Sequence, residues 1–111
     1  FLDALARVAD PRVRGYVVGG AVYRTRGSQV DEASLRARAT ALGLEGRVGF
    51  TGFVPDPAPV LRALDVVVHA STAPEPFGRV IVEGMACGRA VVVSAAGGAA
   101  EIIRPGVDAL A

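Results

Sequence analysis

Two carboxylates eight residues apart, Glu75 and Glu83, are the side chains of this sequence best placed to do chemistry. A Pro-Phe-Gly turn follows the first, and the apolar run after Gly78 predicts a helix with Glu83 more than one turn inside it. The first turn of that helix has no Asp or Glu, so its free N–H groups would attract an anion, commonly a phosphate. Carboxylates accept hydrogen bonds from hydroxyls. Together these features predict a phosphate flanked by sugar hydroxyls, as in a nucleotide-sugar.

The pattern continues beyond the two glutamates into Gly84–Val93, Gly97-Gly98 and Glu101–Ile103. It resembles the retaining, glycogen synthase-like glycosyltransferases of family 4. Within these enzymes, the match is to the carboxyl-terminal, donor-binding domain. The resemblance is strongest over Val66–Ala111 and looser back to Phe1. It implies the Rossmann-like half of a GT-B glycosyltransferase, which moves a sugar from a nucleotide-sugar to an acceptor hydroxyl with retention of configuration.

The resemblance also implies roles for single residues. Glu75 would be catalytic beside the donor sugar, as a hydroxyl ligand, a positioning group or an electrostatic stabiliser, and Glu83 would accept hydrogen bonds from the ribose. A solvated acid is the alternative for each. Further donor-binding candidates narrow the turn, allow close approach or offer backbone N–H groups: Pro76, Phe77, Gly78, Arg79, Val80, Gly97, Gly98, Gly52 and Phe53. The side chain of Arg79 could also reach phosphate, and the backbone of Gly52 and Phe53 would meet the nucleobase. A solvated arginine is the alternative for Arg79, and a plain turn for the glycine pair.

Alternating helices and strands favour an α/β fold. Helices are expected over residues 2–9, 31–42, 57–64, 78–87 and 99–103, and strands over residues 14–18, 47–51, 65–70, 90–94 and 107–111. Such an order predicts a doubly wound, mostly parallel sheet that binds ligands at the carboxyl ends of its strands. Asp31 is expected to cap the second helix. The valine run of the third strand predicts burial on both faces.

The expected organisation is one partial domain. Because the chain opens on a helix, residues 1–111 are interpreted as a truncated nucleotide-sugar binding domain that lacks the amino-terminal acceptor domain. These residues alone are then expected to transfer no sugar. The acceptor would be an unknown hydroxyl compound, and the oligomeric state is left open.

Composition excludes several classes of function. Twelve Arg and no Lys against eleven acids give a net charge of +1, which argues against nucleic acid as a partner. The single cysteine, Cys87, excludes an internal disulfide and a multi-cysteine metal site. No Asp-x-Asp pair is present, so neither a metal nor another cofactor is implied, and the lone His69 is interpreted as structural. A cytoplasmic location is expected, and the intact enzyme could associate peripherally with a membrane.

Two other classes of function remain open. One is a stand-alone nucleotide-sugar binding module without catalysis. A native start at Phe1 would favour this module, whereas a second strand-helix domain upstream would favour the enzyme. The other is a nucleotide-sugar epimerase of the same fold, which turnover without an acceptor would favour. A purely structural doubly wound domain would leave the two glutamates unexplained.

Overall fold

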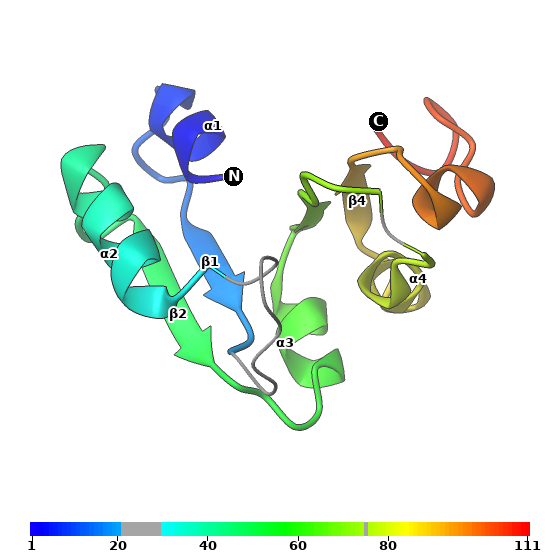
Figure 1. Ribbon diagram of the computed structural model, residues 1–111, viewed down its shortest axis with the longest axis horizontal. Helices are drawn as coiled ribbons and strands as arrows, with labels where there is room; N and C mark the ends of the chain where they lie inside the picture. The colour runs from blue at the N-terminus through cyan, green and yellow to red at the C-terminus, as the bar shows by residue number, and fades with distance from the viewer. Residues whose placement is uncertain (21–29, 75) are drawn as a thin grey trace. The chain divides into compact units, whose positions relative to one another are not determined.

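A computed structural model describes residues 1–20, 30–74 and 76–111. The chain forms two compact units, Phe1–Pro55 and Asp56–Ala111, and each is described by itself. Both combine helices with parallel strands, as the sequence predicts (Figure 1). No helix among the described residues is long and apolar enough to cross a membrane.

The first unit contains α1 (Leu2–Arg7), β1 (Gly15–Val18), α2 (Glu32–Ala41) and β2 (Val48–Gly52). Strand β1 pairs in parallel with β2, from Gly15 opposite Val48 onward. An ion pair between Arg38 and Asp3 joins the two helices and lowers the pKa of the Asp3 carboxyl. The core of this unit consists of four buried apolar side chains: Leu2, Leu5, Ala39 and Leu44.

Helix α2 begins at the predicted cap. The carboxylate of Asp31 accepts hydrogen bonds from the Ser34 N–H at 2.8 Å and from its hydroxyl at 2.7 Å. These bonds satisfy a free donor of the first turn and hold the pKa of Asp31 below its usual range. The expected cap is therefore confirmed.

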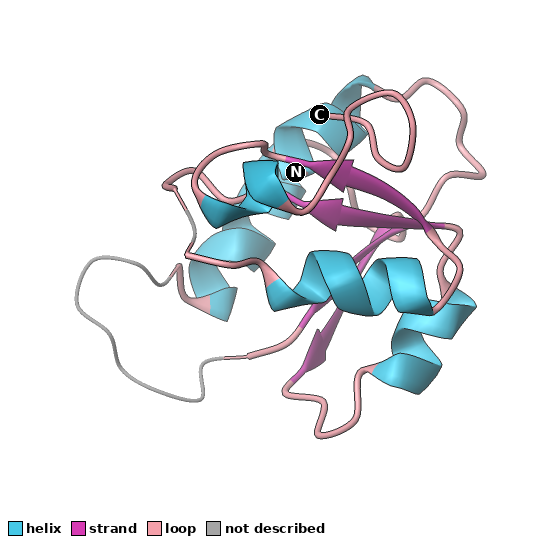
Figure 2. Ribbon diagram, turned by 90° about the vertical axis from the view of Figure 1, so that its right-hand side faces the viewer, coloured by secondary structure: helices cyan, strands magenta, loops and turns pink. Residues whose placement is uncertain are grey.

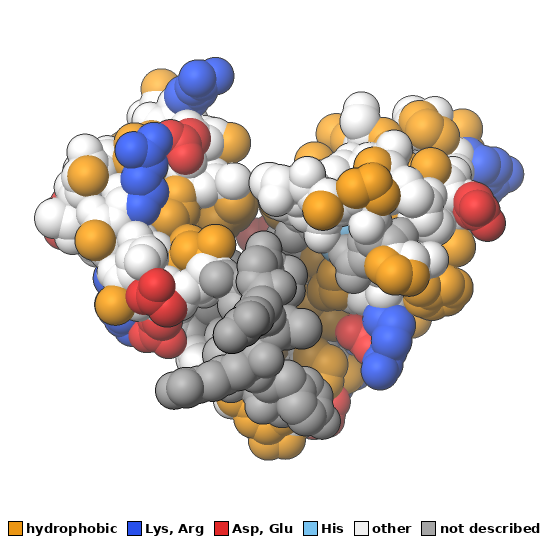
Figure 3. Space-filling view, viewed as in Figure 1, with side chains coloured by type: hydrophobic (Ala, Val, Ile, Leu, Met, Phe, Trp, Pro, Cys, Tyr) orange, Lys and Arg blue, Asp and Glu red, His pale blue; other side chains and the backbone are white. Residues whose placement is uncertain are grey.

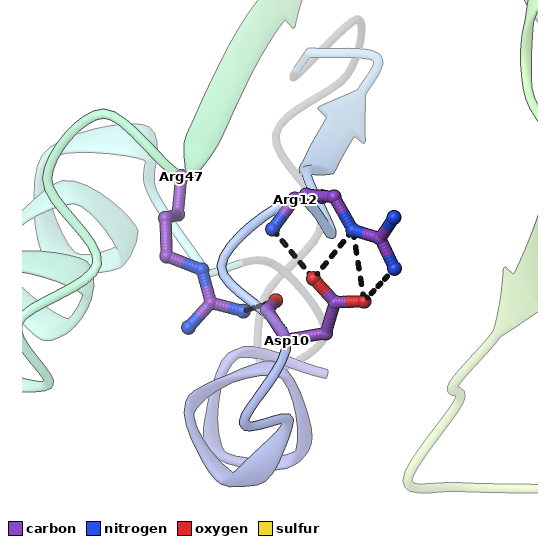
Figure 4. Close-up of polar contacts among 3 residues, drawn as sticks. All are labelled: Asp10, Arg12 and Arg47. Atoms are coloured by element: carbon purple, nitrogen blue, oxygen red, sulfur yellow. Dashed lines mark hydrogen bonds and ion pairs between the residues drawn. The ribbon is translucent and has the colours of Figure 1, made fainter.

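A turn between α1 and β1 is fixed by Asp10 and Arg12 (Figure 4). The Arg12 guanidinium donates to both carboxylate oxygens of Asp10, with the shortest contact at 2.7 Å. Hydrogen bonding within this pair lowers the pKa of Asp10 and raises that of Arg12. Directly before β2, Arg47 donates to the main-chain carbonyls of Val8 and Asp10 at 3.1 and 3.3 Å. One guanidinium thereby ties the turn to the second strand.

The second unit contains α3 (Ala58–Ala63), β3 (Val66–His69), α4 (Arg79–Ala86), β4 (Ala90–Val93) and the 3-10 helix η1 (Gly98–Glu101). Strand β3 pairs in parallel with β4 along its whole length (Figure 2). The two parallel pairs, with the similarity to solved structures reported below, confirm the predicted α/β fold class. Six side chains form the core of this unit: Ile81, Val91, Val93, Ala99, Ile103 and Ala109.

Burial along β3 alternates. Val67 and His69 are 4% and 6% exposed, whereas Val66 and Val68 are 46% and 42% exposed. Helix α4 covers the face that bears Val67, because a Cβ added to Gly84 would lie 3.3 Å from that side chain. The expectation of burial on both faces is therefore wrong for this strand.

The carboxyl-terminal segment differs from the expected strand over residues 107–111. Only Leu110 pairs with β4, accepting from the Val93 N–H at 2.7 Å and donating to the Val91 carbonyl at 3.0 Å. The residues before it form a turn in which the Asp108 carboxylate accepts from the N–H of Arg104 at 2.6 Å. This bond lowers the pKa of Asp108. It also holds Asp108 in the turn, although the expected strand would have included this residue. The helix expected over residues 99–103 is likewise the shorter η1.

Candidate functional site

Two loops that follow neighbouring strands touch at the carboxyl ends of β3 and β4. A Cβ added to Gly98 would lie only 2.0 Å from the carbonyl oxygen of Pro76 and 3.2 Å from the Cα of Phe77. The two main chains therefore approach at a distance that only glycine allows. Parallel strands place their carboxyl ends at one edge of a sheet, which explains why segments twenty residues apart meet here.

The start of α4 lies beside this contact. Gly78 adopts the left-handed conformation with φ 81° and ψ 56°, where a side chain would be strained and would also approach Ile81. It gives the helix no side-chain cap, and the first turn contains no acidic residue. The backbone N–H groups of this turn therefore present the positive end of the helix dipole with no carboxylate of that turn beside it.

The carboxylate of Glu83 lies one turn further along α4. Its side chain is 35% exposed, and its Oε1 atom is 3.2 Å from Nη2 of Arg79, which is 84% exposed. A carboxylate on this largely apolar helix is thus partly sheltered and paired at one oxygen. Carboxylates have about four lone-pair sites, so the pair leaves capacity to accept further hydrogen bonds.

Apolar side chains remain exposed along the same stretch. Phe77 is 53% exposed and Val80 is 36% exposed. Glu75, the first glutamate of the motif, lies outside the described residues. The structure therefore places the second glutamate and the intervening turn.

The predicted pair Gly52 and Phe53 lies in the first unit, at the end of β2. Gly52 has φ 65°, and its carbonyl accepts from the N–H of Gly19 at 3.1 Å. A Cβ added to Gly20 would lie 3.0 Å from the N atom of Phe53, whose side chain is 61% exposed. Here too the loops that follow two parallel strands meet through glycines. A hollow between α2 and β2 lies apart from this contact and is lined by none of the predicted residues.

His69 ends β3 as a buried residue, 6% exposed. Its Nε2 atom lies 3.3 Å from the hydroxyl of Ser71, and its carbonyl accepts from the N–H and hydroxyl of Ser94 at 2.9 and 3.2 Å. The histidine thus joins the ends of both strands, in keeping with the structural interpretation. Sequence reasoning missed the two serines. The available signal is their place just after the valine-rich strands, since Ser94 directly follows β4 and Ser71 lies two residues after β3.

Charge around these elements is mixed. On the face drawn in Figure 3, the Arg side chains of the described residues are scattered, with acidic and apolar side chains between them. Among the described residues, no three His, Cys, Asp or Glu side chains gather as a metal site requires.

The family follows from a comparison of the whole sequence. The profile of the family described as glycosyl transferases group 1 matches residues 1–111. The chain belongs to the group 1 glycosyl transferases. The expectation of a glycosyltransferase family is therefore confirmed.

Two relatives of this group 1 domain are glycosyltransferases by name. The lipopolysaccharide core biosynthesis glycosyltransferase LpsE of Rhizobium meliloti is 39% identical over 84 residues, which are 76% of this chain and 24% of LpsE. The D-inositol 3-phosphate glycosyltransferase of Thermomonospora curvata is 39% identical over 106 residues, which cover 93% of this chain and 24% of that protein. The chain thus spans about a quarter of the length of each.

A solved structure gives the same fold. HepE from Anabaena, in complex with UDP-glucose, is 48% identical and superposes with a TM-score of 0.87. The alignment covers 97% of this chain and 29% of HepE. Within this group 1 domain, the described motif residues Pro76–Val80 lie with Glu83, Gly97 and Gly98 in the second unit, while Gly52 and Phe53 belong to the first.

Proposed function

We propose that this chain is the carboxyl-terminal, donor-binding part of a retaining family 4 glycosyltransferase. The intact enzyme would move a sugar from a nucleoside diphosphate sugar to an acceptor hydroxyl. The observation that carries the proposal is the contact of Gly98 with Pro76 beside the uncapped start of α4, one turn before Glu83. The Anabaena HepE complexes with UDP and UDP-glucose support a nucleotide-sugar as the ligand class.

The start of α4 would receive the anionic part of the donor. Backbone N–H groups of Phe77–Val80 offer donors to phosphate or sugar oxygens, and Gly97 and Gly98 let the neighbouring main chain approach the ligand. As the sugar leaves, negative charge develops on the diphosphate. Oriented N–H groups stabilise such charge without reorganising. No metal is required by this scheme.

The carboxylates would bind the hydroxyl-bearing parts of the donor. Glu83 would accept hydrogen bonds from the ribose, and Glu75 would act beside the transferred sugar, where positive charge develops at the anomeric carbon. Gly52 and Phe53 would meet the nucleobase with their backbone. The acceptor-binding domain would lie in sequence beyond these 111 residues.

The two glutamates can be separated by two ligands. In the intact enzyme, Glu83→Ala should weaken a nucleoside diphosphate and its sugar alike, because the ribose is common to both. Loss of hydrogen bonds to a charged acceptor costs about 1.5–3 kcal/mol, or roughly one to two decades in affinity. Glu75→Ala should leave nucleoside diphosphate binding nearly unchanged and lower turnover instead.

Calorimetry with UDP and UDP-glucose, together with turnover on mixed acceptors, decides the assignment. Equal weakening of UDP by both substitutions would show that ribose and donor sugar are not divided between the two glutamates. Turnover of UDP-glucose without an acceptor would favour an epimerase, and binding of both ligands without any turnover would favour a binding module.

A further inference from the structure

The charge order of α4 is reversed relative to the helices of the first unit. Helix α1 has Asp3 in its first turn and Arg7 in its last, and α2 has Glu32 and Arg38 in the same places. These positions complement the helix dipole, which favours anions at the start and cations at the end. Helix α4 instead begins with Arg79 and has no basic residue in its last turn. Among the described α-helices, it is the one with a cation in its first turn.

The ion pair on α4 is reversed as well. A carboxylate four residues before a cation stabilises a helix more than the opposite order. Glu32 and Arg36 on α2 have the favourable order, with an N–O distance of 2.7 Å. Arg79 and Glu83 have the opposite order, at 3.2 Å. Helix stability therefore gives less reason for an arginine at position 79 than for one at position 36.

The geometry of the pair suggests a different reason. Arg79 contacts Oε1 of Glu83 from one side of the carboxylate, so it restrains the side chain while leaving acceptor sites available. A free glutamate would lose rotamer entropy on binding a hydroxyl, and a restrained one loses less. A guanidinium is suited to this restraint because its donors are fixed in a plane.

We propose that Arg79 is a positioning residue that holds the Glu83 carboxylate ready for the ribose hydroxyls of the donor. The inference rests on the proposed function, since it takes Glu83 as the ribose ligand. It assigns to Arg79 an effect on nucleotide affinity that acts through Glu83, with a small cost to the stability of α4.

A double-mutant cycle in the intact protein tests this coupling. UDP affinity is measured by calorimetry for the wild type, Arg79→Gln, Glu83→Ala and the double variant, and Tm is recorded for each. Arg79→Gln should weaken UDP about three- to tenfold, which is what fixing one flexible side chain contributes. The same substitution in the Glu83→Ala background should change UDP affinity by less than about twofold. Arg79→Lys should restore part of the affinity.

Stability provides the matched control. Arg79→Gln should leave Tm unchanged or raise it, because a cation leaves the positive end of the dipole. Arg36→Gln removes the favourably ordered pair on α2 and also the stacking of that guanidinium over Phe50 at 4.4 Å. It should lower Tm without changing UDP affinity.

Two results would overturn the inference. One is unchanged UDP affinity in Arg79→Gln, and the other is an equal loss with and without Glu83, which would mean that Arg79 acts independently. Unchanged UDP affinity in Glu83→Ala would instead contradict the proposed function, whatever Arg79 does.

Discussion

Helices α2 and α4 each follow a parallel strand, but their first turns differ in capping and in charge. The start of α2 is closed by Asp31, whose carboxylate satisfies the Ser34 N–H, and Glu32 adds a negative charge to the first turn. The start of α4 has the left-handed Gly78, no side-chain cap and no acid in its first turn. Each feature that stabilises α2 is missing at the start of α4.

The difference shows where each helix obtains its stability. Helix α2 buries little more than Ala39 and depends on its cap and surface charges. Helix α4 buries Ile81 completely and packs Gly84 on Val67, so tertiary contacts hold it although its first turn has no side-chain cap. An open helix start is therefore tolerated where the core supplies the stability.

The largest expected effect comes from cavities in the two cores. Among residues 1–20, 30–74 and 76–111, Leu44 and Ile81 are the large side chains that are fully buried, one in each unit. Replacing either by alanine should lower the free energy of unfolding by about 2–5 kcal/mol, measured by urea titration of the intact protein. Only Ile81→Ala should also weaken UDP, because Ile81 packs under Gly78 at the start of α4. Equal loss of UDP affinity in both variants would show that the loss does not depend on the start of α4.

A smaller effect is expected from closing the contact between the two loops. Gly98→Ala would place a Cβ at 2.0 Å from the Pro76 carbonyl oxygen, so the main chains must separate. Overpacking of this kind costs about 1–3 kcal/mol, and UDP affinity should fall at least tenfold if the loops form the site. Gly43→Ala is the control, since Gly43 has φ 67° at the end of α2 and open space around it. It should lower Tm and leave UDP affinity unchanged.

Much of this difference could be predicted from the sequence. The Asp31 cap, the uncapped start after Gly78 and the parallel strands follow from local chemistry and the order of elements. The contact of Gly98 with Pro76 could not be predicted, because a glycine pair signals close approach without naming its partner. The exposed side of β3 was also missed, since a run of valines reads the same whether one face or both are covered.

The smallest expected effect is the loss of stability at low pH from the Asp31 cap of α2. Hydrogen bonds from Ser34 lower the pKa of Asp31, so its contribution to stability is complete above the unfolded pKa of about 3.9. That contribution is lost as the pH falls through the lower folded value. Asp31→Asn should remove this part of the pH dependence while keeping an acceptor at the cap, and Asp31→Ala should lower Tm at neutral pH by a few degrees. Thermal melts between pH 7 and pH 2 measure both, and identical profiles for wild type and Asp31→Asn would contradict the assignment.

The central claim is that the open start of α4 receives the nucleotide. Hydrogen–deuterium exchange of the intact protein, with and without saturating UDP, measures this directly for each backbone segment. We predict slower exchange over Pro76–Glu83 and Gly97–Ala99, with α2 and its neighbouring hollow unchanged. Slower exchange confined to α2, or none over Pro76–Glu83 when calorimetry shows that UDP is bound, would contradict the account.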